Sequence, residues 1–162
     1  NDNKVRIWNT DTNECRELVG HEDDVNSIAY SRDGITLVSA SDDHTCRLWD
    51  VTNRAQLRIF RGATAEVGHV VFSPNDGTVF ASVGFDHTIR IWHGYTGLCI
   101  REITGTSIAE GSELDCDMLA YSPDGTVLAC GMSNSNNELW RIGLLDVNTA
   151  ECVRTIDTAP DA

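Results

Sequence analysis

The residues of this chain that could form a catalytic set are a histidine, a serine and an aspartate. His21, Ser39 and Asp43 lie within one short stretch. In acyl-transfer enzymes, the same three types act as base, nucleophile and orienting acid. A catalytic set must keep all of its members, so the way these positions recur along the chain decides between catalysis and structure.

The segment around these residues is repeated. Val-Arg-Ile-Trp, Cys-Arg-Leu-Trp and Ile-Arg-Ile-Trp end at intervals of 41 and 43 residues, at Trp8, Trp49 and Trp92. An aspartate stands six positions before each tryptophan, at Asp2, Asp43 and Asp86. A period of about 40–45 residues with four short strands per period is typical of a β-propeller of stacked blades.

The repeat copies differ at positions that a catalytic set would have to keep. The second copy keeps Ser82 and Asp86 but has Ala63 in place of His21, and the third has Cys130 in place of the serine. The strand pattern persists while the polar set decays, which indicates a structural role. We therefore expect no catalytic residues, and we expect substitution of His21 to lower stability.

One complete repeat predicts four strands. Residues Val25–Tyr30 alternate apolar and polar, as in a half-buried strand. Ile35–Ala40 is a nearly continuous apolar run, which favours burial on both faces. Thr45–Trp49 and Gln56–Phe60 complete the repeat, and the same order follows over 67–103 and 116–156.

The predicted fold is all-β, with about three and a half four-stranded antiparallel blades. We divide the chain into outer strands of a partial blade and a loop (1–24), two repeat blades (25–66 and 67–113, the second with an extended exit loop) and a divergent blade (114–162). In the divergent blade the third strand has two possible registers, one centred on Trp140 and a favoured one with Leu145 in the tryptophan position.

The motifs resemble the WD-repeat (transducin-like) family of β-propellers over nearly the whole chain. Gly20-His21 opens a repeat, Tyr-Ser-Arg-Asp-Gly ends at Gly34, Tyr-Ser-Pro-Asp-Gly ends at Gly125, and Ser-Ala-Ser-Asp-Asp ends at Asp43. The resemblance implies a propeller of seven or more blades, completed by the same or another chain. It also implies a buried structural tetrad, with members His21, Ser39, Asp43, Trp49, Ser82, Asp86, Trp92, Asp2 and Trp8.

The resemblance further implies a partner-binding rim where the innermost strands begin. Its candidate residues are Asp24, Asn26, Asp42, Glu66, Gly68, Phe85, Asp115 and Asp117, with Ser133 less securely placed. One interpretation is that these acidic loops simply keep the protein soluble. The other is an acidic groove around Phe85 that takes a segment rich in lysine and arginine.

Charge points to protein partners. Lys and Arg total 12 against 25 Asp and Glu, a net charge of −13. This balance disfavours direct binding to nucleic acid or to anionic membrane and favours basic proteins. No run approaches the roughly 18 apolar residues of a membrane span, and the first residues do not resemble a signal peptide.

The six cysteines predict free thiols. Cys15 and Cys99 each follow a repeat tryptophan by seven residues, and Cys152 follows Leu145 by the same interval. No C-x-x-C pair occurs, so we expect buried thiols, no zinc site and an intracellular protein. Asn9–Asn13 lacks the glycine and glutamate of a calcium loop and predicts a plain turn. No cofactor is expected.

The most consistent function is a non-catalytic protein–protein interaction scaffold within a multiprotein complex. The alternative is a regulatory or sensor propeller attached to a nucleotide-binding or other enzymatic domain. An upstream phosphate-binding loop would favour the alternative. An enzyme acting through a central channel would need convergent titratable groups in an open pocket.

Overall fold

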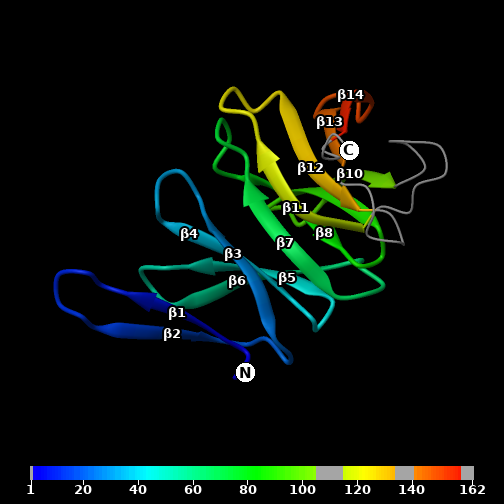
Figure 1. The fold of residues 1–162 in the computed structure, drawn as a ribbon. Coiled ribbons are helices and arrows are strands. Elements are labelled where there is room, and N and C mark those ends of the chain that lie inside the picture. The colour runs from blue at the N-terminus through cyan, green and yellow to red at the C-terminus, as the bar shows by residue number, and fades with distance from the viewer. Residues whose placement is uncertain (1, 105–114, 134–140, 158–162) are drawn as a thin grey trace, which may run out of the picture.

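Antiparallel sheets account for the fold of this protein. The computed structural model describes residues 2–104, 115–133 and 141–157 (Figure 1). A hairpin of β1 (Lys4–Trp8) and β2 (Cys15–Val19) comes first. Three four-stranded sheets follow, which we call blades 1, 2 and 3.

The three blades repeat one strand order. Blade 1 contains β3 (Val25–Tyr30), β4 (Thr36–Ser41), β5 (Thr45–Asp50) and β6 (Ala55–Arg61). Blade 2 contains β7 (Val67–Phe72), β8 (Val79–Gly84), β9 (Thr88–His93) and β10 (Cys99–Thr104). Blade 3 contains β11 (Asp115–Tyr121), β12 (Val127–Ser133), β13 (Arg141–Asp146) and β14 (Cys152–Asp157).

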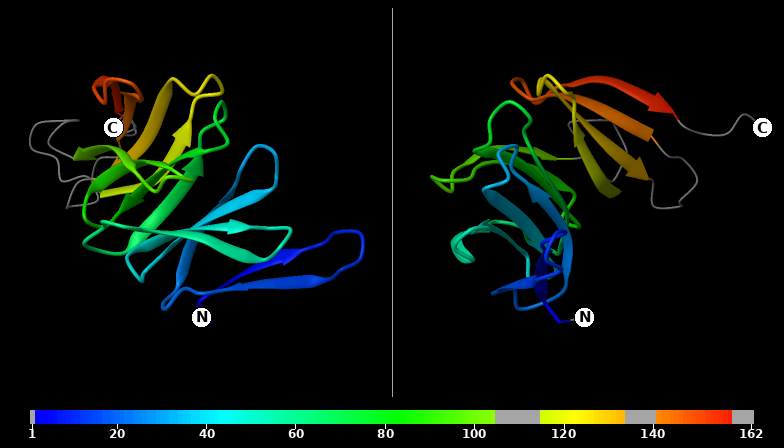
Figure 2. Two further views of the ribbon diagram at one scale, coloured as in Figure 1. Left: turned by 180° about the vertical axis from the view of Figure 1, so that it is seen from behind. Right: turned by 90° about the vertical axis from the view of Figure 1, so that its left-hand side faces the viewer.

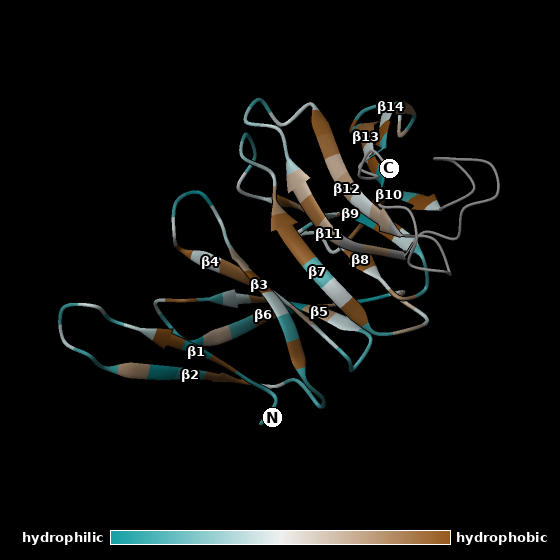
Figure 3. Cartoon of the chain, viewed as in Figure 1, coloured by the Kyte–Doolittle hydropathy of each residue, from teal (hydrophilic) through white to brown (hydrophobic). Residues whose placement is uncertain are grey.

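The sheets follow one another in chain order. Figures 1 and 2 show the hairpin at one end and blade 3 at the other, with β3, β7 and β11 as neighbouring strands. Apolar residues lie along the strands and polar residues in the turns (Figure 3). The predicted all-β fold, built from four-stranded antiparallel propeller blades, is therefore confirmed.

The hydrophobic cores lie between the blades. Phe60 of blade 1 meets Phe80 and Trp92 of blade 2 edge to face, with ring centroids 4.8 and 5.5 Å apart. Ile91 of blade 2 and Leu128 of blade 3 share the next cluster. Because each blade buries its face against its neighbour, the stability of one blade depends on the next.

The second strand of blade 1 is the most enclosed. All six residues of β4 are buried, as the apolar run predicted, although the run starts one residue later than expected because Ile35 is 52% exposed. In contrast, β3 alternates between half-buried and exposed residues, which is the predicted period of two.

The third strands keep one register. Trp49 pairs with Leu37 and Trp92 with Phe80, each in the second strand of its own blade. In blade 3, Leu145 pairs with Leu128 in the equivalent place. Leu145 thus takes the tryptophan position, as the favoured register predicted, and Trp140 lies outside the described residues.

Each innermost strand carries a β-bulge near its start. The pairing register shifts between Val25 and Ser27 in blade 1 and between Val67 and His69 in blade 2. Blade 3 has the same shift on either side of Asp117. A bulge adds one residue and redirects its side chain. The added residue is Asn26 in blade 1, Gly68 in blade 2 and Asp117 in blade 3.

The prediction that the cysteines are buried was partly wrong. Cys46, Cys116 and Cys130 are buried, but Cys15 and Cys99 are exposed and Cys152 is half-buried. Cys15, Cys99 and Cys152 begin β2, β10 and β14, which are the outermost strands of their sheets in the described part of the chain. All six are free thiols, as expected.

Candidate functional site

Four side chains of blade 1 form one hydrogen-bonded chain. Trp49 Nε1 donates to Ser39 Oγ at 2.8 Å, and Ser39 Oγ lies 2.7 Å from His21 Nε2. His21 Nδ1 lies 2.7 Å from Asp43 Oδ2. Asp43 also accepts from the hydroxyl of Thr45 at 2.5 Å. The chain links the loop before β3 to β4, the following turn and β5.

The ionisation of this chain follows from its surroundings. Burial lowers the pKa of His21, although Asp43 opposes the shift, so the imidazole is neutral near pH 7. Burial alone would raise the pKa of Asp43, but hydrogen bonds from Thr45, His21 and the Glu22 backbone hold it well below its ordinary value. A carboxylate only accepts, so Nδ1 carries the proton and Nε2 accepts from Ser39.

The geometry is that of a serine–histidine–aspartate catalytic triad, yet a substrate has no access to the serine oxygen. Ser39 is 0% exposed, and its oxygen is occupied by the Trp49 indole. The His21 side chain is also enclosed. A nucleophile must reach a substrate carbonyl, so this arrangement joins strands rather than presenting a reactive hydroxyl.

Blade 2 keeps half of this chain. Trp92 Nε1 donates to Ser82 Oγ at 2.9 Å. Ala63 stands where the histidine would be. Asp86 keeps two of the other contacts that Asp43 makes in blade 1: it pairs with Arg90 at 2.8 Å and accepts the Thr64 backbone N–H. The carboxylate thus stays satisfied without the histidine.

The β1–β2 hairpin contains a partial copy of the set of residues that is hydrogen-bonded in blade 1. Asp2 forms an ion pair with Arg6, and Trp8 is 62% exposed. In blade 3, Cys130 is fully buried in the serine position.

Sequence reasoning missed the buried arginines. Arg47 is 5% exposed and reaches Asp43 and Gln56, and Arg90 is 6% exposed and reaches Asp86 and Glu102. The signal was present, because an arginine precedes each repeat tryptophan by two residues.

The rim of blade 1 is a polar cluster. The backbone N–H of Asp42 donates to the carbonyl of Asp24 at 2.9 Å. The Asn26 amide donates to the Asp42 carboxylate and, at 3.1 Å, to the Val67 carbonyl of blade 2. The bulged Asn26 therefore connects two blades.

The rim of blade 2 has the same backbone and different side chains. The N–H of Phe85 donates to the carbonyl of Glu66 at 2.9 Å, as Asp42 does to Asp24. Phe85 is 53% exposed, and the Glu66 side chain is also exposed. Gly68 occupies the bulge.

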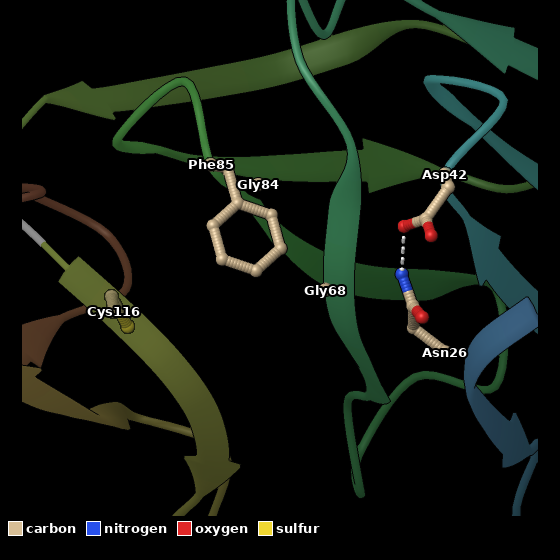
Figure 4. Close-up of a pocket in the computed structure, with 6 residues that line it drawn as sticks. All are labelled: Asn26, Asp42, Gly68, Gly84, Phe85 and Cys116. Carbon is tan, nitrogen blue, oxygen red and sulfur yellow. Dashed lines mark hydrogen bonds between the residues drawn. The ribbon is translucent and has the colours of Figure 1, made fainter.

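A pocket of about 360 Å³ opens at this rim. It is lined by Asn26, Asp42, Gly68, Gly84, Phe85 and Cys116 (Figure 4). Four of the rim candidates thus meet in one place. Asp24 lies instead in a neighbouring hollow beside Asp2. The backbone of Asp115 and Asp117 lies in β11, and their side chains, like that of Ser133, are outside the described part.

The structure also bears on metals and membranes. Among residues 2–104, 115–133 and 141–157, no group of three His, Cys, Asp or Glu side chains could hold a metal ion. Asn9 caps its own turn by accepting the N–H groups of Asp11 and Thr12, as in a plain turn. Within the same ranges, no helix is long and apolar enough to cross a membrane.

Repeated four-stranded antiparallel blades, a Trp–Ser hydrogen bond and a His–Asp contact are together the features of one class of β-propeller repeat. The family described as "WD domain, G-beta repeat" matches residues 12–50 and 54–93. The chain belongs to the WD-repeat family of β-propellers.

Several curated proteins are similar to the chain. It is 29% identical over 148 residues to a guanine nucleotide-binding protein subunit beta of Arabidopsis thaliana, covering 88% of the chain and 39% of that protein. It is 31% identical over 143 residues to the small ribosomal subunit protein RACK1y of Oryza sativa subsp. japonica, covering 87% and 42%.

A third relative is the transcription initiation factor TFIID subunit 5 of Caenorhabditis elegans. It is 31% identical over 145 residues, covering 89% of the chain and 22% of that protein. The chain thus spans less than half of the length of each of these three relatives.

Proposed function

We propose that this chain is part of a non-catalytic, intracellular scaffold that binds other proteins through its rim. The observation that carries the proposal is the pocket at the start of β3, β7 and β11, where Asp42 and the exposed Phe85 line one hollow. Aromatic side chains are enriched at protein-binding surfaces, and a carboxylate beside one supplies charge complementarity to a basic partner. All three relatives described above are named as subunits or as subunit proteins, which supports a place in a multiprotein complex.

The tetrad supports the non-catalytic part of the proposal. Its only hydroxyl nucleophile, Ser39, is fully buried and hydrogen-bonded. We assign His21, Ser39, Asp43 and Trp49 to holding one blade together. Further blades, from the same chain or another, would complete the propeller.

The negative charge of the rim indicates which class of partner it binds. Asp42 lines the pocket, Asp24 lines the neighbouring hollow, and the Glu66 carbonyl accepts the backbone N–H of Phe85, in a chain whose net charge is −13. Complementary charge raises the rate of encounter and falls off with salt. The partner is therefore a protein segment rich in lysine and arginine, and direct binding to nucleic acid is disfavoured.

Charge reversal at the rim tests this proposal. Asp24→Lys with Glu66→Lys should slow the association of a synthetic peptide of alternating arginine, lysine and serine, and should flatten its salt dependence. The matched control, Asp33→Lys with Asp76→Lys, makes the same charge change in the turns at the opposite ends of β3 and β7. Equal association rates for the rim variant and the control would reject the rim as the binding surface.

A further inference from the structure

Gly68 leaves a space at the rim that a side chain fills in blade 1. Asn26 and Gly68 occupy the same bulge in successive blades. The amide of Asn26 lies against Asp42 and reaches across to the Val67 carbonyl. Glycine has no side chain with which to repeat that contact. The missing side chain at Gly68 therefore leaves this part of the pocket open.

Phe85 and Asp42 stand on either side of Gly68. Figure 4 shows the strand that carries Gly68 running between the Phe85 ring and the Asp42 carboxylate. A Cβ atom built on Gly68 would lie 3.6 Å from Phe85 Cε2, so the ring borders the empty place directly. The pocket is bordered by the Phe85 ring and the Asp42 carboxylate, together with Asn26, Cys116 and the two glycines Gly68 and Gly84.

The Phe85 ring and the Asp42 carboxylate together favour a flat cation as the ligand. A guanidinium group stacks its face on an aromatic ring and donates its N–H groups to a carboxylate. A lysine ammonium is a point charge and stacks poorly on a ring. One oxygen of Asp42 is held by the Asn26 amide, so the carboxylate is oriented before any ligand arrives.

We propose that the pocket formed by Phe85, Gly68 and Asp42 receives a single arginine side chain from a partner protein. The volume of about 360 Å³ suits one long side chain rather than a folded segment. Asp24 and Glu66 add attraction at longer range. This inference rests on the proposed function, since it specifies the residue by which the basic segment is recognised.

The test uses a peptide of lysine and serine with one central arginine, and two analogues with citrulline or lysine at that place. Affinity is measured by fluorescence anisotropy on the whole chain. The arginine peptide should bind about tenfold more tightly than either analogue, a difference of about 1.4 kcal/mol. Equal affinities for the three peptides would contradict the proposal.

Gly68→Asn blocks the pocket without changing charge. The residue has no positive φ, a Cβ makes only ordinary contact, and Asn26 already occupies the equivalent place in blade 1, so the variant should fold. It should lower the affinity for the arginine peptide to that for the citrulline peptide. Gly77→Asn, in the turn at the other end of β7 with open space around it, is the matched control and should bind like the wild type.

A second variant keeps the test independent of Gly68. Phe85→Leu removes the aromatic face and retains an apolar side chain, so it should abolish the preference for arginine over lysine. If charge reversal at Asp24 and Glu66 weakens binding while Gly68→Asn and Phe85→Leu do not, the arginine pocket is wrong and the acidic rim stands. If no basic peptide binds the wild type, both proposals fail.

Discussion

His21 Nδ1 lies 2.7 Å from Asp43 Oδ2, and this contact ties the loop that enters β3 to the turn between β4 and β5. Both side chains are almost fully enclosed. The contact therefore closes one edge of blade 1, and several measurable consequences depend on it.

Replacing His21 by alanine should destabilise the protein. The change leaves the Ser39 hydroxyl and the Asp43 carboxylate each short of one partner, and an unsatisfied buried polar group costs about 1–3 kcal/mol. Urea unfolding should show a lower midpoint with an unchanged slope. Ala63, at the equivalent place in blade 2, offers the control, because Ala63→Gly removes no hydrogen bond. A midpoint for His21→Ala equal to that of the wild type would contradict the structural role.

Stability should fall as the solution becomes acidic. Burial lowers the pKa of both His21 and His69 below the ordinary value of 6.5. The unfolded chain then takes up protons first, so the stabilisation is fully present above pH 6.5 and is lost as the pH falls below it. Unfolding in urea at pH 7.5 and 5.5 measures the loss. The double variant His21→Gln and His69→Gln should lose less stability over this interval, and an identical loss would exclude these histidines as its cause.

Asp43 extends the loss into the acid range. Its folded-state pKa lies well below the ordinary value of 3.8, because its hydrogen bonds outweigh the effect of burial. Its contribution is present above pH 3.8 and is lost as the pH falls toward the folded-state pKa. In Asp43→Asn, the unfolding free energy should be lower at pH 7 and should change less between pH 4 and 2.5. A wild-type acid profile in this variant would show that another carboxylate is responsible.

Gly20→Ala should be poorly tolerated. A Cβ there would lie 2.7 Å from Arg47 Nη1 and 2.9 Å from Trp49 Cη2, so buried neighbours must move. Overpacking of this kind costs about 1–3 kcal/mol. Gly77→Ala, with nothing within 4 Å, should change the unfolding free energy by less than about 0.5 kcal/mol. Equal melting temperatures for the two variants would mean that the loop does not pack on Trp49.

The thiols should differ sharply in reactivity. Burial raises the pKa of Cys46 to about 12, whereas Cys15 is exposed at the start of an outer strand. Because the thiolate is the reactive form, iodoacetamide at pH 7.5 should label Cys15 rapidly and leave Cys46 unlabelled until the protein unfolds. Mass spectrometry of the digested protein measures both rates. Comparable labelling of the two residues in the folded state would place Cys46 outside the core.

The sequence predicted the parts of the fold that depend on local pattern. Alternation in Val25–Tyr30, the apolar run of β4 and the recurrence of Trp49 at Trp92 gave strand order and equivalence. The offset from Cys152 was enough to favour Leu145 as the partner of Leu128.

Other features depend on contacts between distant residues. A bulge changes pairing by one residue and leaves the alternation of β3 visible, so the redirection of Asn26 could not be read from the sequence. The contact of Asn26 with Val67 joins separate blades. The exposure of Cys15 and Cys99 follows from the position of the outermost strands, which apolar character alone does not reveal.

One comparison separates the buried tetrad from the binding rim most directly. Unfolding free energy and affinity for the arginine peptide are measured side by side for the wild type, His21→Ala and Gly68→Asn. We expect His21→Ala to lose stability and keep its affinity, and Gly68→Asn to keep stability and lose about tenfold in affinity. Full affinity in a folded Gly68→Asn protein, or unaltered stability in His21→Ala, would contradict this division of roles.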